Sequence, residues 1–224
     1  MSTGKATGGI RMRAGVRGIA VAAAMVVALT GCGDGDGTGA ATGIADGKEK
    51  VQPASLDATG LINALPVSSE FSDGTYTGGD PELVPEAEAA KFCADKLEDV
   101  DCAGVKAASI KDLVLAGSSS DDGVTFTLYT FGTEAEATAV LKAVEEVRKS
   151  SKGEDGPFKP VKAETGADET YAFERDDYVG VYMRVGTVVS YASTYLFGPE
   201  RAERAAQVQV GRLKVVAGGG NPDL

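Results

Sequence analysis

The chain has 224 residues, and its 33 Asp and Glu against 22 Lys and Arg give it a net charge of −11. A surface this acidic repels nucleic acids and anionic lipid headgroups. Direct binding of DNA or RNA is therefore not expected. The chain has no histidine, which excludes Ser-His-Asp triads, Cys-His pairs and HExxH zinc sites. It also has no phosphate-binding loop and no GxGxxG motif, so no cofactor is expected.

The amino-terminal segment has the organisation of a secretory signal peptide. Lys5 to Arg17 form a basic region, and an apolar run of eleven residues follows from Ile19 to Leu29. The run is too short for a membrane span, which needs about 20 residues. Without residues 1–31 the chain keeps 18 Lys and Arg against 33 Asp and Glu, a net charge of −15.

The apolar run ends in Leu29-Thr30-Gly31-Cys32. This motif resembles the lipobox of bacterial lipoproteins. The resemblance implies cleavage before Cys32, a diacylglyceryl group on its sulfur, and anchoring at the outer face of the cytoplasmic membrane. Two acyl chains hold a protein stably, because each buried CH₂ contributes about 0.8 kcal/mol. The alternative is an ordinary signal peptide with a chance cysteine.

Composition divides the rest of the chain into three parts. Residues 32–55 are rich in Gly, Ala, Thr and Asp without hydrophobic periodicity, which predicts a flexible tether. Residues 56–217 have the pattern of a single extracellular domain, long enough for one hydrophobic core. Residues 218–224, GGGNPDL, are expected to be a disordered tail.

The first predicted helix of this domain runs from Pro85 to about Val100, with proline in its first turn. Cys93 lies within it and Cys102 just beyond it. In an exported protein, two cysteines that remain after lipidation are expected to form a disulfide, here worth about 2–3 kcal/mol. A redox-active pair is the alternative, although the spacing is not CxxC and no histidine is present to activate a thiolate.

A β-hairpin and a second helix are predicted next. Alternating patterns over Ser109–Ala116 and Val124–Phe131 flank the turn sequence GSSSDDG. Thr133 and Glu136 then form a capping box that opens a helix. The apolar stripe of this helix consists of Ala137, Val140, Leu141, Val144 and Val147.

Three more strands and a last helix complete the pattern. The strands are expected around Thr170–Glu174, Tyr178–Val185 and Val188–Phe197, and the helix begins after Gly198 with Pro199 near its first position. This order predicts an α+β fold, with a mostly antiparallel sheet of about five strands and about three helices packed on one of its faces.

Gly186-Thr187 joins the last two strands and suits a two-residue type II′ turn. The turn sets a register in which Tyr182 faces Tyr191. One face of the hairpin then carries four tyrosines and an arginine, which form a candidate ligand- or partner-binding face: Tyr178, Tyr182, Arg184, Tyr191 and Tyr195.

This tyrosine face has two interpretations. In the first, the tyrosines are ordinary cross-strand pairs covered by a loop or by the amino-terminal segment. In the second, the opposite Val/Met face lies under the helices and the tyrosine face is open, so that it could stack sugars or hold a peptide.

Three segments, FCADKLEDVDC, YVGVYMRVGTVVSY and ERAERAAQVQVGRLK, carry a further resemblance. The domain is similar to the PknH-like extracellular sensor domains of actinobacteria, which occur as kinase ectodomains and as free lipoproteins. This resemblance implies a disulfide-stapled α+β fold that encloses a ligand cleft. It implies no catalytic residue.

The sequence therefore predicts a non-enzymatic lipoprotein held to the membrane through Cys32. Its domain would bind a small ligand, a wall fragment or an envelope protein. One alternative is a secreted hydrolase that uses two carboxylates about 5–10 Å apart in a pocket. Another is a structural or chaperone-like envelope factor without a small ligand.

Overall fold

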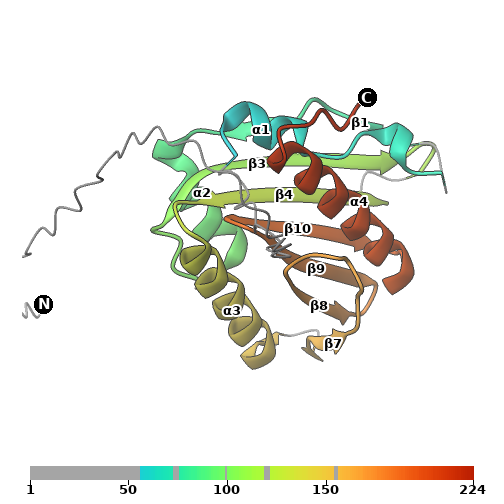
Figure 1. Cartoon of the computed structure of the whole chain (residues 1–224). Helices are drawn as coiled ribbons and strands as arrows, with labels where there is room; N and C mark the ends of the chain where they lie inside the picture. The colour runs from blue at the N-terminus through green and yellow to red at the C-terminus, as the bar shows by residue number, and fades with distance from the viewer. Residues whose placement is uncertain (1–55, 73–75, 99, 119–121, 154–155) are drawn as a thin grey trace, which may run out of the picture. The chain divides into compact units, whose positions relative to one another are not determined.

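The computed structural model describes residues 56–224 except residues 73–75, 99, 119–121 and 154–155 (Figure 1). The predicted signal peptide, the lipidation of Cys32 and the tether lie outside the described residues. An eight-stranded antiparallel sheet with helices packed on it confirms the α+β class, with more strands than the five expected. In the part of the chain that is described, no helix is both long enough and apolar enough to cross a membrane.

The strands follow the order β1-β3-β4-β10-β9-β8-β7 across the sheet, and β2 pairs with β3 as well. The predicted hairpins form the middle of the sheet, where β10 joins β4 to β9. A separate pair, β5 (Lys152–Gly153) and β6 (Gly156–Pro157), stands apart. The strands of the main sheet are β1 (Tyr76–Gly78), β2 (Glu82–Val84), β3 (Val105–Leu115), β4 (Gly123–Phe131), β7 (Lys159–Val161), β8 (Glu169–Arg175), β9 (Tyr178–Val185) and β10 (Val188–Tyr195).

The predicted helices begin where their capping residues place them. The backbone N–H of Glu136 donates to the Thr133 hydroxyl over 3.2 Å, and the N–H of Thr133 donates to the Glu136 carboxylate over 2.9 Å, which completes the capping box. Pro85 precedes one helix and Pro199 opens another. Proline lacks a backbone N–H, and in the first turn of a helix that N–H would have no partner within the helix. The helices are α1 (Ala58–Asn63), the 3₁₀ turn η1 (Ser68–Glu70), α2 (Glu86–Leu97), α3 (Glu134–Ser150) and α4 (Pro199–Ala217).

The expectation that the helices cover one face of the sheet is wrong. Helices α1 and α4 pack on one face, and α2 and α3 pack on the other (Figure 1). The Val/Met side of β9 lies under α4, as the second interpretation required. The opposite face of the sheet also carries apolar side chains, such as Tyr129, Phe173 and Val189. The helices on that side bury them away from water.

The predicted disulfide is present between Cys93 of α2 and Cys102, whose Cα atoms lie 5.9 Å apart. Both cysteines are buried against the core on the α2–α3 side. The bridge therefore fastens the carboxyl end of α2 to the segment that leads into β3. Between the two cysteines, Glu98 ends the helix with a positive φ of 43°.

Two buried polar side chains of α4 hold the first described residues. Gln209 donates to the carbonyl of Ala64 over 2.8 Å, and Arg212 donates to the carbonyl of Asn63 over 2.6 Å. In the tail after α4, Asp223 accepts a hydrogen bond from Arg212 over 2.8 Å. Elements that are distant in the sequence are thus joined on one side of the sheet.

Candidate ligand-binding cleft

The β9–β10 hairpin has the predicted register, with Tyr182 paired to Tyr191 and Tyr178 to Tyr195. Gly186 has a φ of 56°, and positive φ is absent at the next residue. This combination fits a type II′ turn, in which only the first central residue needs the left-handed region. Local turn chemistry therefore sets which side chains share the tyrosine face.

The tyrosine face is neither wholly covered nor wholly open. Tyr182 is 1% exposed, and α3 packs over this part of the sheet. Tyr178 and Tyr191 are half-buried, and Tyr195 at the strand end is 44% exposed. Exposure thus rises along the row as the strands leave the cover of α3.

Arg184 belongs to a separate buried cluster. Its guanidinium donates to Glu169 over 2.9 Å, to Asp168 over 3.2 Å and to the carbonyl of Gly186 over 2.9 Å. Asp168 in turn accepts from the N–H of Gly186 over 2.8 Å. These contacts satisfy Arg184 and brace the turn, and Arg184 does not line the cleft described next.

A hollow of about 220 Å³, here called the tyrosine cleft, lies where the tyrosine face emerges from under α2 and α3. The ends of these helices form two of its sides and the sheet forms its floor. Three of the four tyrosines predicted from the sequence lie in it. Its lining consists of Lys96, Leu97, Ile110, Thr125, Thr127, Tyr129, Arg148, Tyr178, Tyr182, Tyr191 and Ser193.

Aromatic rings form the covered end of the cleft. The rings of Tyr182 and Tyr191 stack with their centroids 4.2 Å apart, and Phe173 lies 6.0 Å from Tyr182 on the other side. Gly180 makes this packing possible, because a Cβ there would lie 2.5 Å from the Phe173 ring and 3.0 Å from the Tyr191 hydroxyl. The half-buried Tyr191 is the member of this stack that borders open space.

Hydroxyl groups line the floor of the cleft. Thr125 and Thr127 of β4 lie next to Ser193 and Tyr191 of β10. Burial raises the pKa of Tyr178 to about 12, against an opposing hydrogen bond to Ser193. Tyr178 is therefore neutral at physiological pH, as the serine and threonine hydroxyl groups are. All of them can accept a hydrogen bond from a ligand, whereas Thr125 already donates its own to Asp112 over 2.5 Å.

Arg148 of α3 brings a charge into the cleft. Its side chain is 12% exposed, and it donates to the Glu98 carboxylate over 3.3 Å. Burial opposes its charged form, but the neighbouring Tyr182 and Glu98 outweigh this, so its pKa is raised. The guanidinium lies 5.2 Å from the Phe158 ring centroid, and its buried Nε has no hydrogen-bond partner.

Sequence reasoning missed Arg148, although a signal was present. It follows Val144 by four positions and so continues the apolar stripe of α3 toward the sheet. A charged residue on the buried side of an amphipathic helix is unusual and points to a partner or a site.

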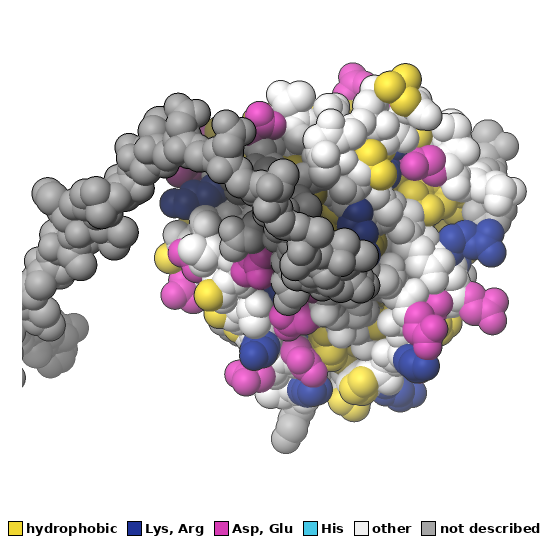
Figure 2. Space-filling model, in the orientation of Figure 1, with side chains coloured by type: hydrophobic (Ala, Val, Ile, Leu, Met, Phe, Trp, Pro, Cys, Tyr) yellow, Lys and Arg dark blue, Asp and Glu magenta, His cyan; other side chains and the backbone are white. Residues whose placement is uncertain are grey.

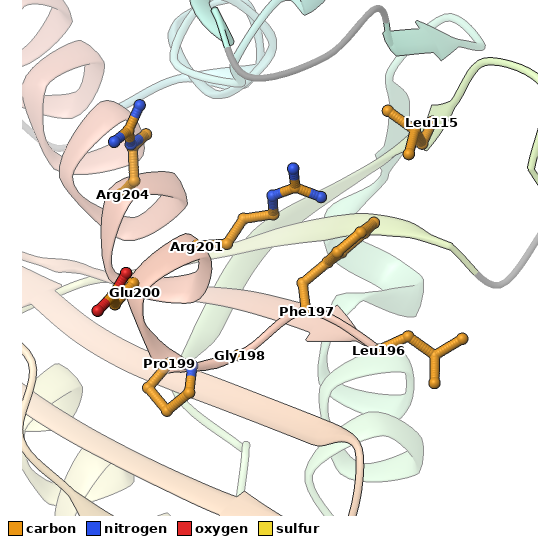
Figure 3. Close-up of a pocket in the computed structure, with 8 residues that line it drawn as sticks. All are labelled: Leu115, Leu196, Phe197, Gly198, Pro199, Glu200, Arg201 and Arg204. Carbon is orange, nitrogen blue, oxygen red and sulfur yellow. The ribbon is translucent and has the colours of Figure 1, made fainter.

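Two further hollows lie at the strand ends. One, of about 650 Å³, adjoins the tyrosine cleft, since both are lined by Thr125, Tyr178 and Ser193. The other, of about 640 Å³, lies at the start of α4, where the Arg201 guanidinium faces the Phe197 ring at 3.9 Å (Figure 3). Apart from Asp112 in the first and Glu200 in the second, their lining contains no carboxylate, and that of the tyrosine cleft contains none.

Charges of both signs are mixed on the surface. Lys and Arg side chains are interspersed with Asp and Glu over the face that Figure 2 shows. Within the described ranges, no group of three or more Cys, Asp and Glu side chains is arranged to hold a metal ion.

No protein-family model matches the chain, and no curated protein matches its sequence. Among solved structures it is similar to the extracellular domain of PknH from Mycobacterium tuberculosis, with a TM-score of 0.53 and 12% identity over 72% of this chain and 98% of that one. A fainter likeness, with a TM-score of 0.39 and 10% identity over 69% and 96%, is to an uncharacterized protein of Mycobacterium smegmatis, the Rv0999 ortholog. The chain therefore shares the fold of the PknH extracellular domain.

Proposed function

We propose that this chain is a lipid-anchored extracytoplasmic protein whose domain binds a small polar ligand in the tyrosine cleft without catalysis. The fold likeness to the extracellular domain of PknH supports an extracytoplasmic, sensor-like role. The Leu29–Cys32 motif and the disulfide between Cys93 and Cys102 favour an exported, oxidised protein.

The observation that carries the proposal is the composition of the tyrosine cleft. It combines an aromatic end, a floor of neutral hydroxyl groups and one largely buried arginine. Small-molecule sites are concave and largely apolar, with a few convergent polar groups that fix the ligand's orientation. A structural factor without a ligand has no need for such a hollow.

The hydrolase alternative receives less support. Hydrolysis by two carboxylates needs a pair of acids that face one another across a pocket. Each of the three hollows contains at most one, and Asp112 is hydrogen-bonded to Thr125 over 2.5 Å.

Replacing Cys32 with serine tests the anchor. Serine cannot form the thioether to diacylglycerol, so the variant is expected to move from the membrane pellet to the medium or to persist as an uncleaved precursor. Fractionation and intact mass distinguish these forms from the lipidated protein. A Cys32→Ser protein of normal mature mass in the membrane fraction would contradict lipid anchoring.

Thermal unfolding of the full chain with sugars, wall fragments, amino acids and lipids tests the cleft. A ligand at 100 times its Kd adds about 2.7 kcal/mol to the free energy of unfolding. For a domain of this size, that shifts the Tm by about 5–11 °C. Tyr191→Leu is expected to abolish the shift, because Tyr191 lines the cleft.

The matched control is Tyr195→Leu, the same substitution at an exposed position outside the tyrosine cleft. The Tm of each variant without ligand gives its own baseline. A shift that survives Tyr191→Leu but not Tyr195→Leu would move the site to the adjoining hollow and refute the proposal.

A further inference from the structure

The largely buried charge of Arg148 needs a compensating partner. A buried cation is costly unless anions and hydrogen-bond acceptors surround it. The acid that contacts its guanidinium is Glu98, and the Tyr182 hydroxyl lies beside it. Two further cations are near, with Lys96 in the cleft lining and Arg175 stacked at 4.3 Å on the Phe158 ring that Arg148 also faces.

Glu98 is a weak partner for this role. Its side chain is 71% exposed, and the ion pair is long, at 3.3 Å. An ion pair with so exposed a member contributes little, since water screens it. The carboxylate can therefore leave Arg148 at little cost when another carboxylate replaces it.

The remaining lining limits the shape of the ligand. A volume of about 220 Å³ is below the ~300–1,000 Å³ of sites for drug-sized molecules, so the cleft admits about one ring. Tyr191 borders it with an aromatic ring, on which sugar rings stack. Thr125, Thr127 and Ser193 offer hydroxyl groups for the hydroxyl or amide groups of such a ring.

We infer that the tyrosine cleft binds a small hydroxylated ring acid, the chemistry of an acidic sugar, whose carboxylate replaces that of Glu98 on Arg148. This inference rests on the proposed ligand-binding function and adds the chemical class of the ligand. In the free protein Glu98 occupies the carboxylate position, and in the complex it turns to solvent. Arg148 suits the role because its planar guanidinium can donate two parallel hydrogen bonds to a carboxylate.

Calorimetric titration of the full chain with two matched pairs of probes tests the inference. N-acetylmuramic acid and N-acetylglucosamine differ only in the lactyl group that bears the carboxylate, and glucuronic acid and glucose differ in an acid that replaces a primary alcohol. At least one acid is expected to bind roughly tenfold more tightly than its neutral partner, because its carboxylate gains a charge-assisted hydrogen bond to Arg148. The pair that shows the preference identifies a wall sugar or a uronic acid as the source.

Substitutions at the ion pair test the exchange. Arg148→Gln is expected to remove the preference for the acid. Glu98→Gln removes the competing carboxylate from a side chain that is 71% exposed, and is expected to raise affinity for the acid several-fold and leave the neutral probe unaffected. The control Asp95→Asn removes the same charge from the same helix end, at a side chain that pairs with Lys91 instead, and is expected to change affinity less than twofold.

Equal affinity for acid and neutral probes, or a Glu98→Gln effect no larger than that of Asp95→Asn, would overturn the inference. So would the failure of all four probes in a protein whose Tm another ligand raises through Tyr191. In these cases the proposed function stands, because the cleft still binds a ligand. A different result would refute the proposed function itself: a ligand that raises the Tm of the Tyr191→Leu variant as much as that of the unmodified protein.

Discussion

Replacing Arg212 with methionine is expected to lower the free energy of unfolding by about 3 kcal/mol, because breaking a buried ion pair leaves its partners uncompensated. Arg212 is 4% exposed and donates to the carboxylates of Glu70 and Asp223 over 3.2 and 2.8 Å. It also donates to the carbonyl of Asn63 over 2.6 Å. Methionine retains most of the packing volume but none of the donors. Thermal or urea unfolding measures the loss, about 6–12 °C in Tm for a domain of this size.

The control for this substitution is Arg204→Met on the same helix. Arg204 is exposed, and surface substitutions usually change stability by less than about 0.5 kcal/mol. A loss at Arg212 no greater than at Arg204 would show that the buried cluster does not hold α1 to α4.

Gly180→Ala is expected to destabilise the domain by about 1–3 kcal/mol, the usual cost of overpacking. The new Cβ would lie 2.5 Å from the Phe173 ring and 3.0 Å from the Tyr191 hydroxyl. Phe173 has no room to yield, since the rings of Phe158 and Tyr182 lie 4.9 and 6.0 Å from it. Chemical unfolding measures the change, and the disturbed position of Tyr191 is expected to weaken ligand binding as well.

Two comparisons make the Gly180 result specific. Gly211→Ala, at an exposed site in α4 where a Cβ meets nothing within 4 Å, is expected to stabilise by about 0.5–1 kcal/mol through helix propensity. The double variant Gly180→Ala with Phe173→Leu is expected to lose less than the sum of its parts, because leucine is shorter than the ring that clashes. Additive losses would show that the strain arises elsewhere.

Sequence rules were sufficient for the elements and for local pairing. The Thr133–Glu136 box, Pro199 and Gly186-Thr187 each act within a few residues, and the structure places helix starts and hairpin register where these rules put them. The pairing of Cys93 with Cys102 was inferred because they are the two cysteines that remain if Cys32 is lipidated in an exported protein. Short β1, β2 and β7 were missed, since three-residue edge strands have almost no periodic signal.

The distribution of helices over the two faces could not be inferred in the same way. Tyrosine has an apolar body and a polar end, so alternation alone does not distinguish a solvated tyrosine face from one that a helix covers. The tyrosine cleft depends on where α2 and α3 end above the sheet, which is a tertiary property. Arg148 also lines the cleft, although it precedes Tyr178, Tyr182 and Tyr191 by 30 or more positions in the sequence.

The attachment of α4 to the first described residues has a consequence for how the chain folds. Arg212 and Gln209 bond to carbonyls that precede them by 149 and 145 positions, so the core between α1 and α4 closes only when the last segment is available. Contacts between the two ends of a chain carry a high loop-closure cost and slow the folding reaction. A nascent chain therefore completes the core between α1 and α4 only after α4 has been synthesised, so this side of the sheet is the last to close.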